Sequence, residues 1–351
     1  MSMIHLPDYE DRAGLWAGEL QPWMPGRIFD AHVHLGPPEA VPPLAPERDI
    51  LLTLWTALEW QEALAGYGRL FGGKAMAGVI AFPFPIREAD IQASNRYIAR
   101  LMAEDKRVKG FMLVHPARME EARREFYAHA EKGVRFLGLK PYYDLLGKSA
   151  AETSMSELVP ESMLEFMRRE NLMLMIHPCG IGVGDPAVGG HVRLMAEKYP
   201  EVKVILAHFG RHTHPDQFLR FMDTGLMDYP SLYLEMSAVT SPAAHKRAIA
   251  ERALWPRIMF GSDMPWAMLE GRELYCERGS GCVLLTRHEY RWSDKDMLAR
   301  HAAARESLTY KIYYVLKSLK DAIEGPAVKP AERQKLKEDI LCNNAFRLFG
   351  E

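Results

Sequence analysis

Short apolar runs recur along the chain, and segments with helical spacing lie between them. The apolar runs cover residues 27–34, 74–84, 108–116, 134–143, 171–180, 202–210, 231–239 and 257–266. Several of them are continuous rather than alternating in polarity, which is typical of strands that are buried on both faces. The clearest helical segment is 118–133, where Met119, Ala122 and Phe126 form an apolar stripe and Gly133 follows as a stop signal.

The order of these segments predicts the fold class. Helical patterns also occur in residues 87–105, 159–171, 191–200 and 241–254. Eight strands that alternate with helices predict a parallel sheet with right-handed crossovers, and at this number an α/β fold of the closed (β/α)8 TIM-barrel type fits best. A doubly wound open sheet is the alternative, but the first strand lacks the GxGxxG turn that often accompanies it.

Two regions lie outside this repeat. Residues 1–26 precede the first strand and are expected to pack on the barrel as an N-terminal extension, through Trp16 and Trp23. Residues 27–351 then form the barrel domain, with a helical insertion after the last strand at residues 267–325. Within it, residues 293–323 are predicted to be helical, because apolar residues recur near helical spacing, and to lie outside the barrel, where they partly cover its mouth or a partner chain.

Composition and charge narrow the range of partners. The chain has 351 residues, of which 48% are hydrophobic and 26% are charged, and its formal net charge is −2. This balance gives no general attraction to nucleic acid or to an anionic membrane surface. No apolar run reaches 18 residues, the N-terminus lacks a signal pattern, and the four cysteines are scattered. We therefore expect a cytoplasmic protein with reduced thiols that does not bind a membrane.

Side chains with metal-ligand chemistry lie at the ends of several predicted strands. His32 and His34 are two positions apart on the first strand, so they project from the same face. His177 ends the fifth strand, His208 the sixth, and Asp263 the eighth. The carboxyl ends of the strands carry the chemistry of such barrels, so this set predicts a metal site there.

These residues stand in motifs that resemble the amidohydrolase superfamily, and most closely its amidohydrolase-2 branch of metal-dependent hydrolases and decarboxylases. The matching pieces are FDAHVH, GLKPYY, MIHPCG, VILAHFG, MFGSDMPW and NNAFRLFG, which span nearly the whole chain. The resemblance implies that His32, His34, His177 and Asp263 hold a divalent metal. It also implies that His208 stands beside the metal-bound water as an acid/base or electrostatic helper.

The chemistry of these residue types suits those roles. Imidazoles and one carboxylate can bind Zn²⁺, with Mn²⁺ as the alternative, and leave a position open for a water molecule whose pKa falls to about 7. Asp263 can accept the proton of that water, and His208 can transfer a proton to or from the substrate. Asp30 is interpreted as a buried acid that fixes an imidazole tautomer, and Glu235 is a candidate support for the ligands.

Four further residues are candidates for contact with substrate. In two-metal relatives a lysine on the fourth strand takes up CO₂ and bridges both ions, so Lys140 is either such a bridge or a substrate or structural residue. Arg211 is placed at the rim and could bind a substrate carboxylate, or be an ordinary loop charge. Tyr142 and Trp266 are candidates for an aromatic wall, with packing under loops as the alternative.

Three functions remain open from the sequence. The first is a metal-dependent hydrolase that uses a metal-activated water on a small ester, lactone or amide. The second is a metal-dependent non-oxidative decarboxylase of an aromatic or unsaturated acid. The third, an inactive binding barrel, is disfavoured because the ligand set is intact. A small-molecule substrate is expected in the active cases, and residues 267–325 are a candidate homodimer surface by analogy with the branch.

Overall fold

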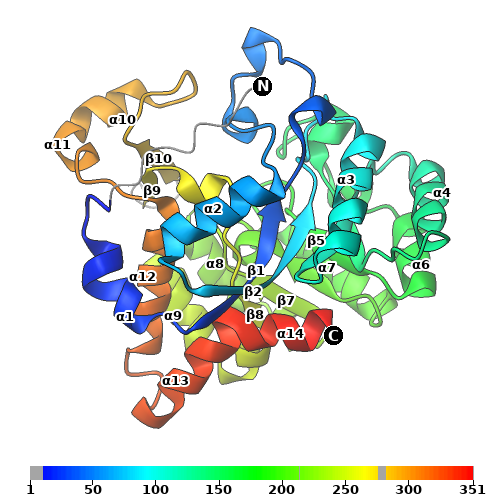
Figure 1. Ribbon diagram of the computed structural model, residues 1–351. Coiled ribbons are helices and arrows are strands. Elements are labelled where there is room, and N and C mark those ends of the chain that lie inside the picture. Colours follow the sequence, from blue (N-terminus) through cyan, green and yellow to red (C-terminus); the bar gives the residue numbers. More distant parts are fainter. Residues whose placement is uncertain (1–10, 213, 276–281, 351) are drawn as a thin grey trace.

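The computed structural model describes residues 11–350 except for residues 213 and 276–281. Its centre is a sheet of eight parallel strands, each paired with the next strand in chain order. The strands are β1 Arg27–His34, β2 Ala75–Phe82, β3 Val108–Val114, β4 Gly138–Pro141, β5 Met173–Ile176, β6 Val204–Leu206, β7 Leu232–Glu235 and β8 Ile258–Met259. The TIM-barrel prediction is confirmed, and all eight strands lie within the apolar runs of the sequence (Figure 1).

The barrel closes where the residues after β8 meet β1. The backbone N–H of Ala31 donates to the carbonyl of Phe260 at 2.9 Å. Further along, the N–H of Asp263 donates to the carbonyl of His32, also at 2.9 Å. These bonds continue in parallel sense beyond the two residues of β8, so the last strand extends as far as the candidate site.

Apolar side chains fill the barrel, and the C-terminal helix plugs its lower end. Phe29 from β1 and Phe111 from β3 are both buried inside. The ring of Phe349 in α14 (Asn344–Phe349) stacks on Phe29 with centroids 5.9 Å apart, and meets Phe111 edge-on at 6.0 Å. In Figure 1 the arrows of β1 and β2 point away from α14, so the plug and the candidate site lie at opposite ends of the barrel.

Helices surround the strands, and the longer ones bury one of their own faces against the rest of the fold. They are α1 Gln21–Trp23, α2 Trp60–Phe71, α3 Ile91–Glu104, α4 Met119–Ala130, α5 Met155–Leu158, α6 Glu161–Glu170, α7 Pro186–Lys198, α8 Pro215–Met222, α9 Pro242–Ala250, α10 Lys295–Arg300, α11 Ala302–Arg305, α12 Lys311–Ile323, α13 Pro330–Glu338 and α14. Side chains cap several of their amino ends: the Asp90 carboxylate accepts from the N–H of Ala93, and the Ser241 hydroxyl accepts from that of Ala244.

Helices α2 and α8 are among those missing from the sequence prediction, each for a physical reason. Helix α2 carries Gly66 and Gly68, which weaken helical propensity. Gly66 lies close to Met264, where a Cβ would come within 3.3 Å of the terminal methyl group of that side chain. Helix α8 has only eight residues, so its apolar spacing covers little more than two turns.

The segment after β8 is only partly helical. It begins with an antiparallel pair, β9 (Gly271–Tyr275) and β10 (Cys282–Thr286), which the sequence prediction did not contain. The predicted continuous helix 293–323 is also broken into α10, α11 and α12. The break before α12 has a local cause, because Tyr310 is extended and forms a bridge with Glu270, while the N–H of Lys311 donates to the carbonyl of Leu269 at 2.8 Å.

The N-terminal residues contact the outer helices. Trp16 stacks on Tyr313 of α12 with ring centroids 5.7 Å apart, and it also meets Phe71 of α2 at 6.1 Å. Trp23 is buried as well. Residues 16 and 23 therefore pack against the rest of the fold, whereas residues 1–10 of the expected N-terminal extension lie outside the described residues.

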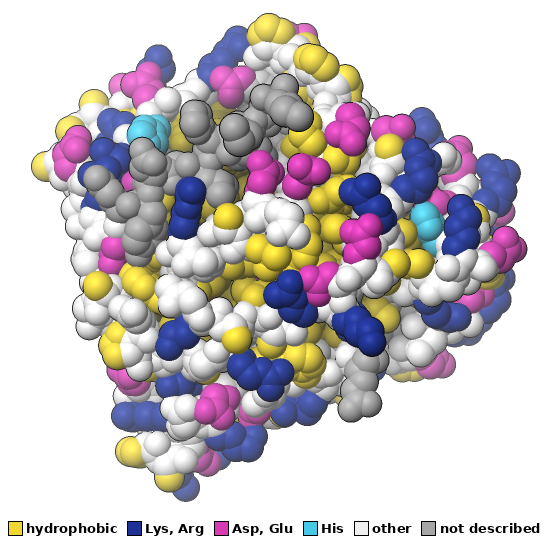
Figure 2. Space-filling model, in the orientation of Figure 1, with side chains coloured by type: hydrophobic (Ala, Val, Ile, Leu, Met, Phe, Trp, Pro, Cys, Tyr) yellow, Lys and Arg dark blue, Asp and Glu magenta, His cyan; other side chains and the backbone are white. Residues whose placement is uncertain are grey.

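The outer surface mixes charges of both signs. On the face drawn in Figure 2, acidic and basic side chains are interspersed, and hydrophobic side chains gather near its centre. In the described part of the chain, the helices are all too short or too polar to cross a bilayer.

The plug predicts a stability effect. We expect Phe349→Ala to lower the free energy of unfolding by about 3–5 kcal/mol, because it removes a buried ring and leaves a cavity under the barrel. Leu194→Ala, at a side chain that is 54% exposed on α7, is the control and should change it by less than about 0.5 kcal/mol. Urea unfolding followed by circular dichroism measures both, and equal effects would contradict the role of α14.

Candidate metal centre

His32 and His34 lie side by side at the end of β1, as their spacing predicted. Their ring centroids are 5.3 Å apart, and both side chains are buried. The ring of Phe82 from β2 meets both imidazoles edge-on, at 4.8 Å and 4.6 Å between centroids. This packing limits the rotation of the two rings, so their position is set before any ligand binds.

Asp263 faces both imidazoles from the end of β8. Its Oδ1 atom lies 3.3 Å from His32 Nε2 and 3.4 Å from His34 Nε2. Asp263 has a φ of 62°, a left-handed conformation that is unfavourable for a residue with a side chain. The backbone bond from Asp263 to His32 holds it there.

His208 and His177 complete a ring of imidazoles around the same point. His208 lies in a 3₁₀ turn, Ala207–Gly210, and also has a left-handed φ of 56°. Its ring centroid is 5.0 Å from that of His32 and 5.1 Å from that of His177. The predicted side chains from β1, β5, β6 and β8 therefore do converge at one end of the barrel.

A buried carboxylate behind the imidazoles orients two of them. Glu235 Oε2, at the end of β7, lies 2.8 Å from His32 Nδ1 and accepts a hydrogen bond of 2.8 Å from the Ser237 hydroxyl. That hydroxyl is 2.9 Å from His208 Nδ1, whose distance to the carbonyl of Ser237 is 3.0 Å. With their Nδ1 atoms engaged in this way, His32 and His208 keep their Nε2 atoms for the centre.

The remaining two imidazoles have different surroundings. His34 Nδ1 lies 3.2 Å from the carbonyl of Pro83, which leaves its Nε2 atom facing Asp263. His177 Nδ1 is buried and has no hydrogen-bond partner among the residues that the structure describes. A buried nitrogen without a partner is costly unless something binds it, so this atom is available to a ligand.

Asp30 does not hold an imidazole, contrary to the expectation from the sequence. Its buried carboxylate accepts hydrogen bonds from the backbone N–H of His32 at 3.1 Å and of Ser262 at 2.8 Å, and from the hydroxyl of Tyr67 at 2.7 Å. It therefore ties the backbone of β1 to the chain after β8. Burial raises the pKa of Asp30 to about 7.

The electrostatics of the centre favour neutral imidazoles beside an ionised carboxylate. Burial lowers the pKa of all four histidines, His32, His34, His177 and His208. Burial alone would raise the pKa of Asp263, but the neighbouring imidazoles outweigh it and hold that pKa below its usual range. Neutral nitrogen donors and a charged oxygen donor are what a divalent ion requires.

The donor set fits a divalent transition metal. One ligand atom from each of His32, His208 and Asp263 lies within 4.8 Å of the others. This group differs from the predicted set, because it contains His208 in place of His34 and His177. All five side chains border the same point, so which of them bind an ion remains a prediction. Nitrogen donors with one carboxylate match zinc chemistry and also suit manganese less specifically.

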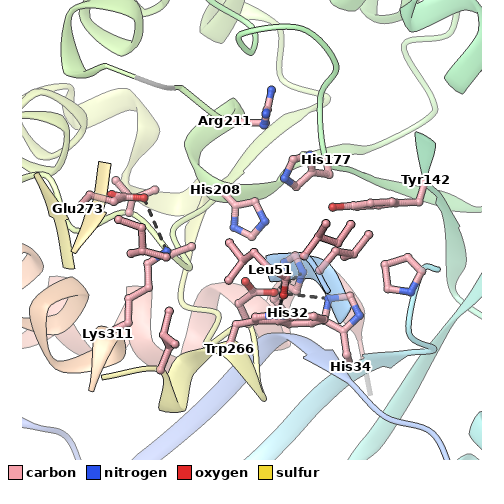
Figure 3. A pocket seen from close by; sticks show the side chains of 18 of the residues that line it. His32, His34, Leu51, Tyr142, His177, His208, Arg211, Trp266, Glu273 and Lys311 are labelled. Atoms are coloured by element: carbon pink, nitrogen blue, oxygen red, sulfur yellow. Dashed lines mark hydrogen bonds and ion pairs between the residues drawn. The ribbon is translucent and has the colours of Figure 1, made fainter. Parts of the chain in front are cut away.

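The centre opens into a cavity of about 430 Å³ (Figure 3). Lys140, on β4, lines it and is buried, with Nζ 4.6 Å from the centroid of the Phe82 ring. Burial lowers the pKa of Lys140 to about 8, although Asp263 and Glu235 oppose the shift. A strongly shifted lysine beside converging ligands in a cavity is typical of a functional site.

The other candidates for substrate contact also line this cavity. Tyr142 lies with its ring 5.3 Å from that of His177, and Trp266 meets His34 edge-on at 4.8 Å. The indole N–H of Trp266 donates to the carbonyl of Leu51 at 2.9 Å, which holds the loop after β1 over the cavity. Arg211 points at the cavity from beyond β6 and donates to the carbonyl of Gly180.

Several residues of the site, whether they support its side chains or line the cavity, were not found from the sequence. Ser237 could have been found, because it lies two positions after Glu235 at the end of β7. Glu273 and Lys311 reach the cavity from β9 and α12, as Figure 3 shows. No sequence pattern marks them, because they come from the irregular segment after β8 rather than from a strand end.

Comparison with known proteins places this barrel in a family. Residues 29–350 match the amidohydrolase-2 family, described as amidohydrolase, so the chain belongs to it. No curated protein matches the sequence.

Solved structures show the same fold at low identity. An amidohydrolase 2 from Bifidobacterium longum subsp. infantis has 16% identity and a TM-score of 0.50, with 92% of this chain and 98% of that chain covered. A 4-oxalomesaconate hydratase from Rhodopseudomonas palustris has 13% identity, a TM-score of 0.51 and coverage of 92% and 95%. A 2,6-dihydroxybenzoate decarboxylase from Rhizobium has 15% identity, a TM-score of 0.50 and coverage of 92% and 98%.

The role of Glu235 predicts an effect on metal affinity. We expect Glu235→Gln to weaken zinc binding about 10- to 100-fold, since the amide orients the His32 ring less strongly than the carboxylate does. Glu125→Gln is the matched control, because Glu125 on α4 is mostly buried, at 12% side-chain exposure, but lies outside this cavity. Competition with a chromogenic chelator measures both affinities, and an unchanged affinity in Glu235→Gln would refute the role.

Proposed function

We propose that this family member is a metal-dependent hydrolase that acts on a small ester, lactone or amide. The observation that carries the proposal is the convergence of four neutral imidazoles and one ionised carboxylate on a partly enclosed cavity. A cavity of about 430 Å³ suits a small-molecule substrate. Oriented donors at the carboxyl ends of barrel strands are the arrangement that metal-assisted hydrolysis requires.

In this proposal His32, His34, His177 and Asp263 hold a single divalent ion, with zinc preferred and manganese as the alternative. When bound there, the ion would lower the pKa of a water molecule and polarise the substrate carbonyl. Four protein donors suffice to bind one ion, which leaves His208 for another task.

The proton transfers fall to Asp263 and His208. Asp263 stays ionised beside the imidazoles, so its second oxygen can accept a proton and pass it toward the leaving group. His208 is kept neutral by burial, so it can act as a base. Ser237 fixes the orientation of the His208 ring through Nδ1 and thereby directs Nε2 toward the reacting groups.

Substrate binding uses the walls of the cavity. Tyr142 and Trp266 offer aromatic faces on two sides of the centre, and Arg211 offers a guanidinium above it (Figure 3). A flat or unsaturated substrate with an acidic group would satisfy all three. The expected homodimer would form through the segment after β8.

A non-oxidative decarboxylase of an aromatic or unsaturated acid is the second candidate. The observation that favours it is the positive charge of the cavity, where Lys140 is buried close to the metal ligands and would attract a substrate carboxylate. An inactive binding barrel is disfavoured, because it would not need the full set of donors.

The role of Lys140 separates a one-metal site from a two-metal site. If Lys140 bridges two ions after taking up CO₂, His208 would serve as a ligand of the second ion. If Lys140 contacts substrate instead, one ion is bound. Metal stoichiometry therefore reports on Lys140 and His208 together.

Two histidine variants test the assignment of His208. We expect His208→Asn to keep nearly full metal occupancy and to lose about 10²- to 10⁴-fold in rate, which is the usual contribution of a general acid or base. His177→Asn should lose metal as well as activity. Metal analysis and turnover are measured on both variants. Parallel loss of metal and activity in His208→Asn would contradict its role and favour the two-metal site.

Metal removal tests the reaction class. Dialysis against a chelator should abolish hydrolysis of a panel of lactones and esters, and added zinc should restore it, because the ion supplies the activated water. Release of CO₂ from a parallel panel of aromatic acids is followed independently. Turnover that persists without metal would refute the proposal, and CO₂ release without lactone hydrolysis would favour the decarboxylase.

A further inference from the structure

One end of the cavity is built by the segment after β8 and is polar. Lys311, the first residue of α12, and Glu273, on β9, line the cavity there. Figure 3 shows them on the side of His208 opposite to Tyr142. This end is therefore separate from the aromatic wall, and the ligands of the proposed metal lie between the two.

The pair is held in place by its surroundings. The Glu273 carboxylate accepts hydrogen bonds from Thr240, at 3.1 Å from the hydroxyl and 3.3 Å from the backbone N–H. The carbonyl of Thr240 in turn accepts a hydrogen bond of 2.9 Å from Ser318 of α12. The N–H of Lys311 is bound to Leu269, as described above. Both ends of the pair are thus fixed to the barrel through the loop after β7.

The ammonium of Lys311 has hydrogen-bonding capacity that no described residue uses. Its Nζ atom lies 3.6 Å from Glu273 Oε1, which is an ion pair but too long for a hydrogen bond. Among the described residues no hydrogen bond to this Nζ occurs, although the side chain is only 12% exposed. A mostly buried ammonium with free donors is costly unless an acceptor reaches it.

A second polar atom at this end also lacks a hydrogen-bond partner in the described part of the chain. His212 lines the cavity, and its Nδ1 atom is buried without a hydrogen bond to any described residue. The pair and His212 share this end with the apolar side chains of Leu269 and Leu284. Apolar walls strengthen a charge interaction, because they exclude water from it.

The sign of the charge favours an anion. The basic side chains that line the cavity are Lys140, Arg211 and Lys311, whereas Asp263 and Glu273 are the acidic ones among the described residues. A divalent ion would make the cavity more positive still. At the far end Glu273 offsets the charge of Lys311, but it leaves the N–H donors of the ammonium for an anionic acceptor that a substrate with one anionic group near the metal would not supply.

We propose that Lys311 selects substrates that carry a second anionic group, such as a carboxylate, remote from the reacting carbonyl. Glu273 is the positioning residue that holds the ammonium toward the cavity. This inference rests on the proposed function, because it adds a substrate class to the same site. It assigns the segment after β8 a part in specificity, apart from any role in a dimer.

Binding of simple acids to the zinc-loaded protein tests the inference without turnover. The probes are isophthalate and terephthalate, with benzoate and monomethyl terephthalate as ligands that lack the second charge. The wild-type protein should bind the better dicarboxylate about 10- to 100-fold more tightly than the half-ester, the range of one charge-assisted hydrogen bond. Isothermal titration calorimetry measures each affinity.

Variants attribute the preference to one residue. Lys311→Met should bring the ratio of the dicarboxylate affinity to the half-ester affinity close to one and leave the affinity for benzoate unchanged. Lys311→Arg should retain most of the preference for the dicarboxylate. Lys295→Met is the control, because Lys295 belongs to the same segment but its side chain is 72% exposed. If Lys311→Met unfolds, as thermal unfolding would show, Lys311→Gln replaces it.

The outcomes separate this inference from the proposed function. Equal affinities in the wild type, no binding of either dicarboxylate, or a preference that survives Lys311→Met would overturn the role of Lys311. Tighter binding of 4-(aminomethyl)benzoate than of the half-ester would also overturn the role of Lys311, because Glu273 would then be the residue that binds the remote charged group. Zinc content and lactone hydrolysis are measured on the same samples, and each affinity is measured with and without zinc. Failure of the proposed function is therefore recognised independently of the role of Lys311.

Discussion

The backbone hydrogen bonds between β1 and the residues after β8 hold the candidate centre together. Residues that are about 230 positions apart in the chain become neighbours through the bond from Asp263 to His32. The same closure brings the Asp263 carboxylate within 3.4 Å of two imidazole nitrogens. Without a closed barrel these donors would be far apart, so the proposed metal site can form only when the barrel closes.

Two buried carboxylates reinforce that closure from below. Asp30 binds the backbone of both closing segments, and Glu235 orients the imidazoles of His32 and, through Ser237, His208. The left-handed conformations of His208 and Asp263 cost on the order of 1–3 kcal/mol each, which this network offsets. Gly261 leaves space for the side chains of this network, since a Cβ at position 261 would lie 2.8 Å from His32 Cβ.

The barrel and the donors were predictable because their signals are local. The apolar runs of β1, β5, β6 and β8 carry, at or near their ends, residues whose chemistry is recognisable by itself, and the parallel order of the strands brings those ends together. The partner of Asp30 was predicted wrongly, because a sequence cannot tell a carboxylate that binds backbone N–H groups from one that binds an imidazole. Lys311 and the hairpin that carries Glu273 were also missed. Their positions depend on tertiary pairing, such as the bridge from Glu270 to Tyr310, rather than on periodicity.

A crystal structure of the protein grown with zinc, with anomalous differences recorded at the zinc edge, tests the central claim most directly. The proposed metal site predicts one strong peak at the carboxyl ends of the strands, about 2.0–2.2 Å from nitrogen atoms of His32, His34 and His177 and from an oxygen of Asp263. A peak held by other side chains, or no peak at this end of the barrel, would contradict the account.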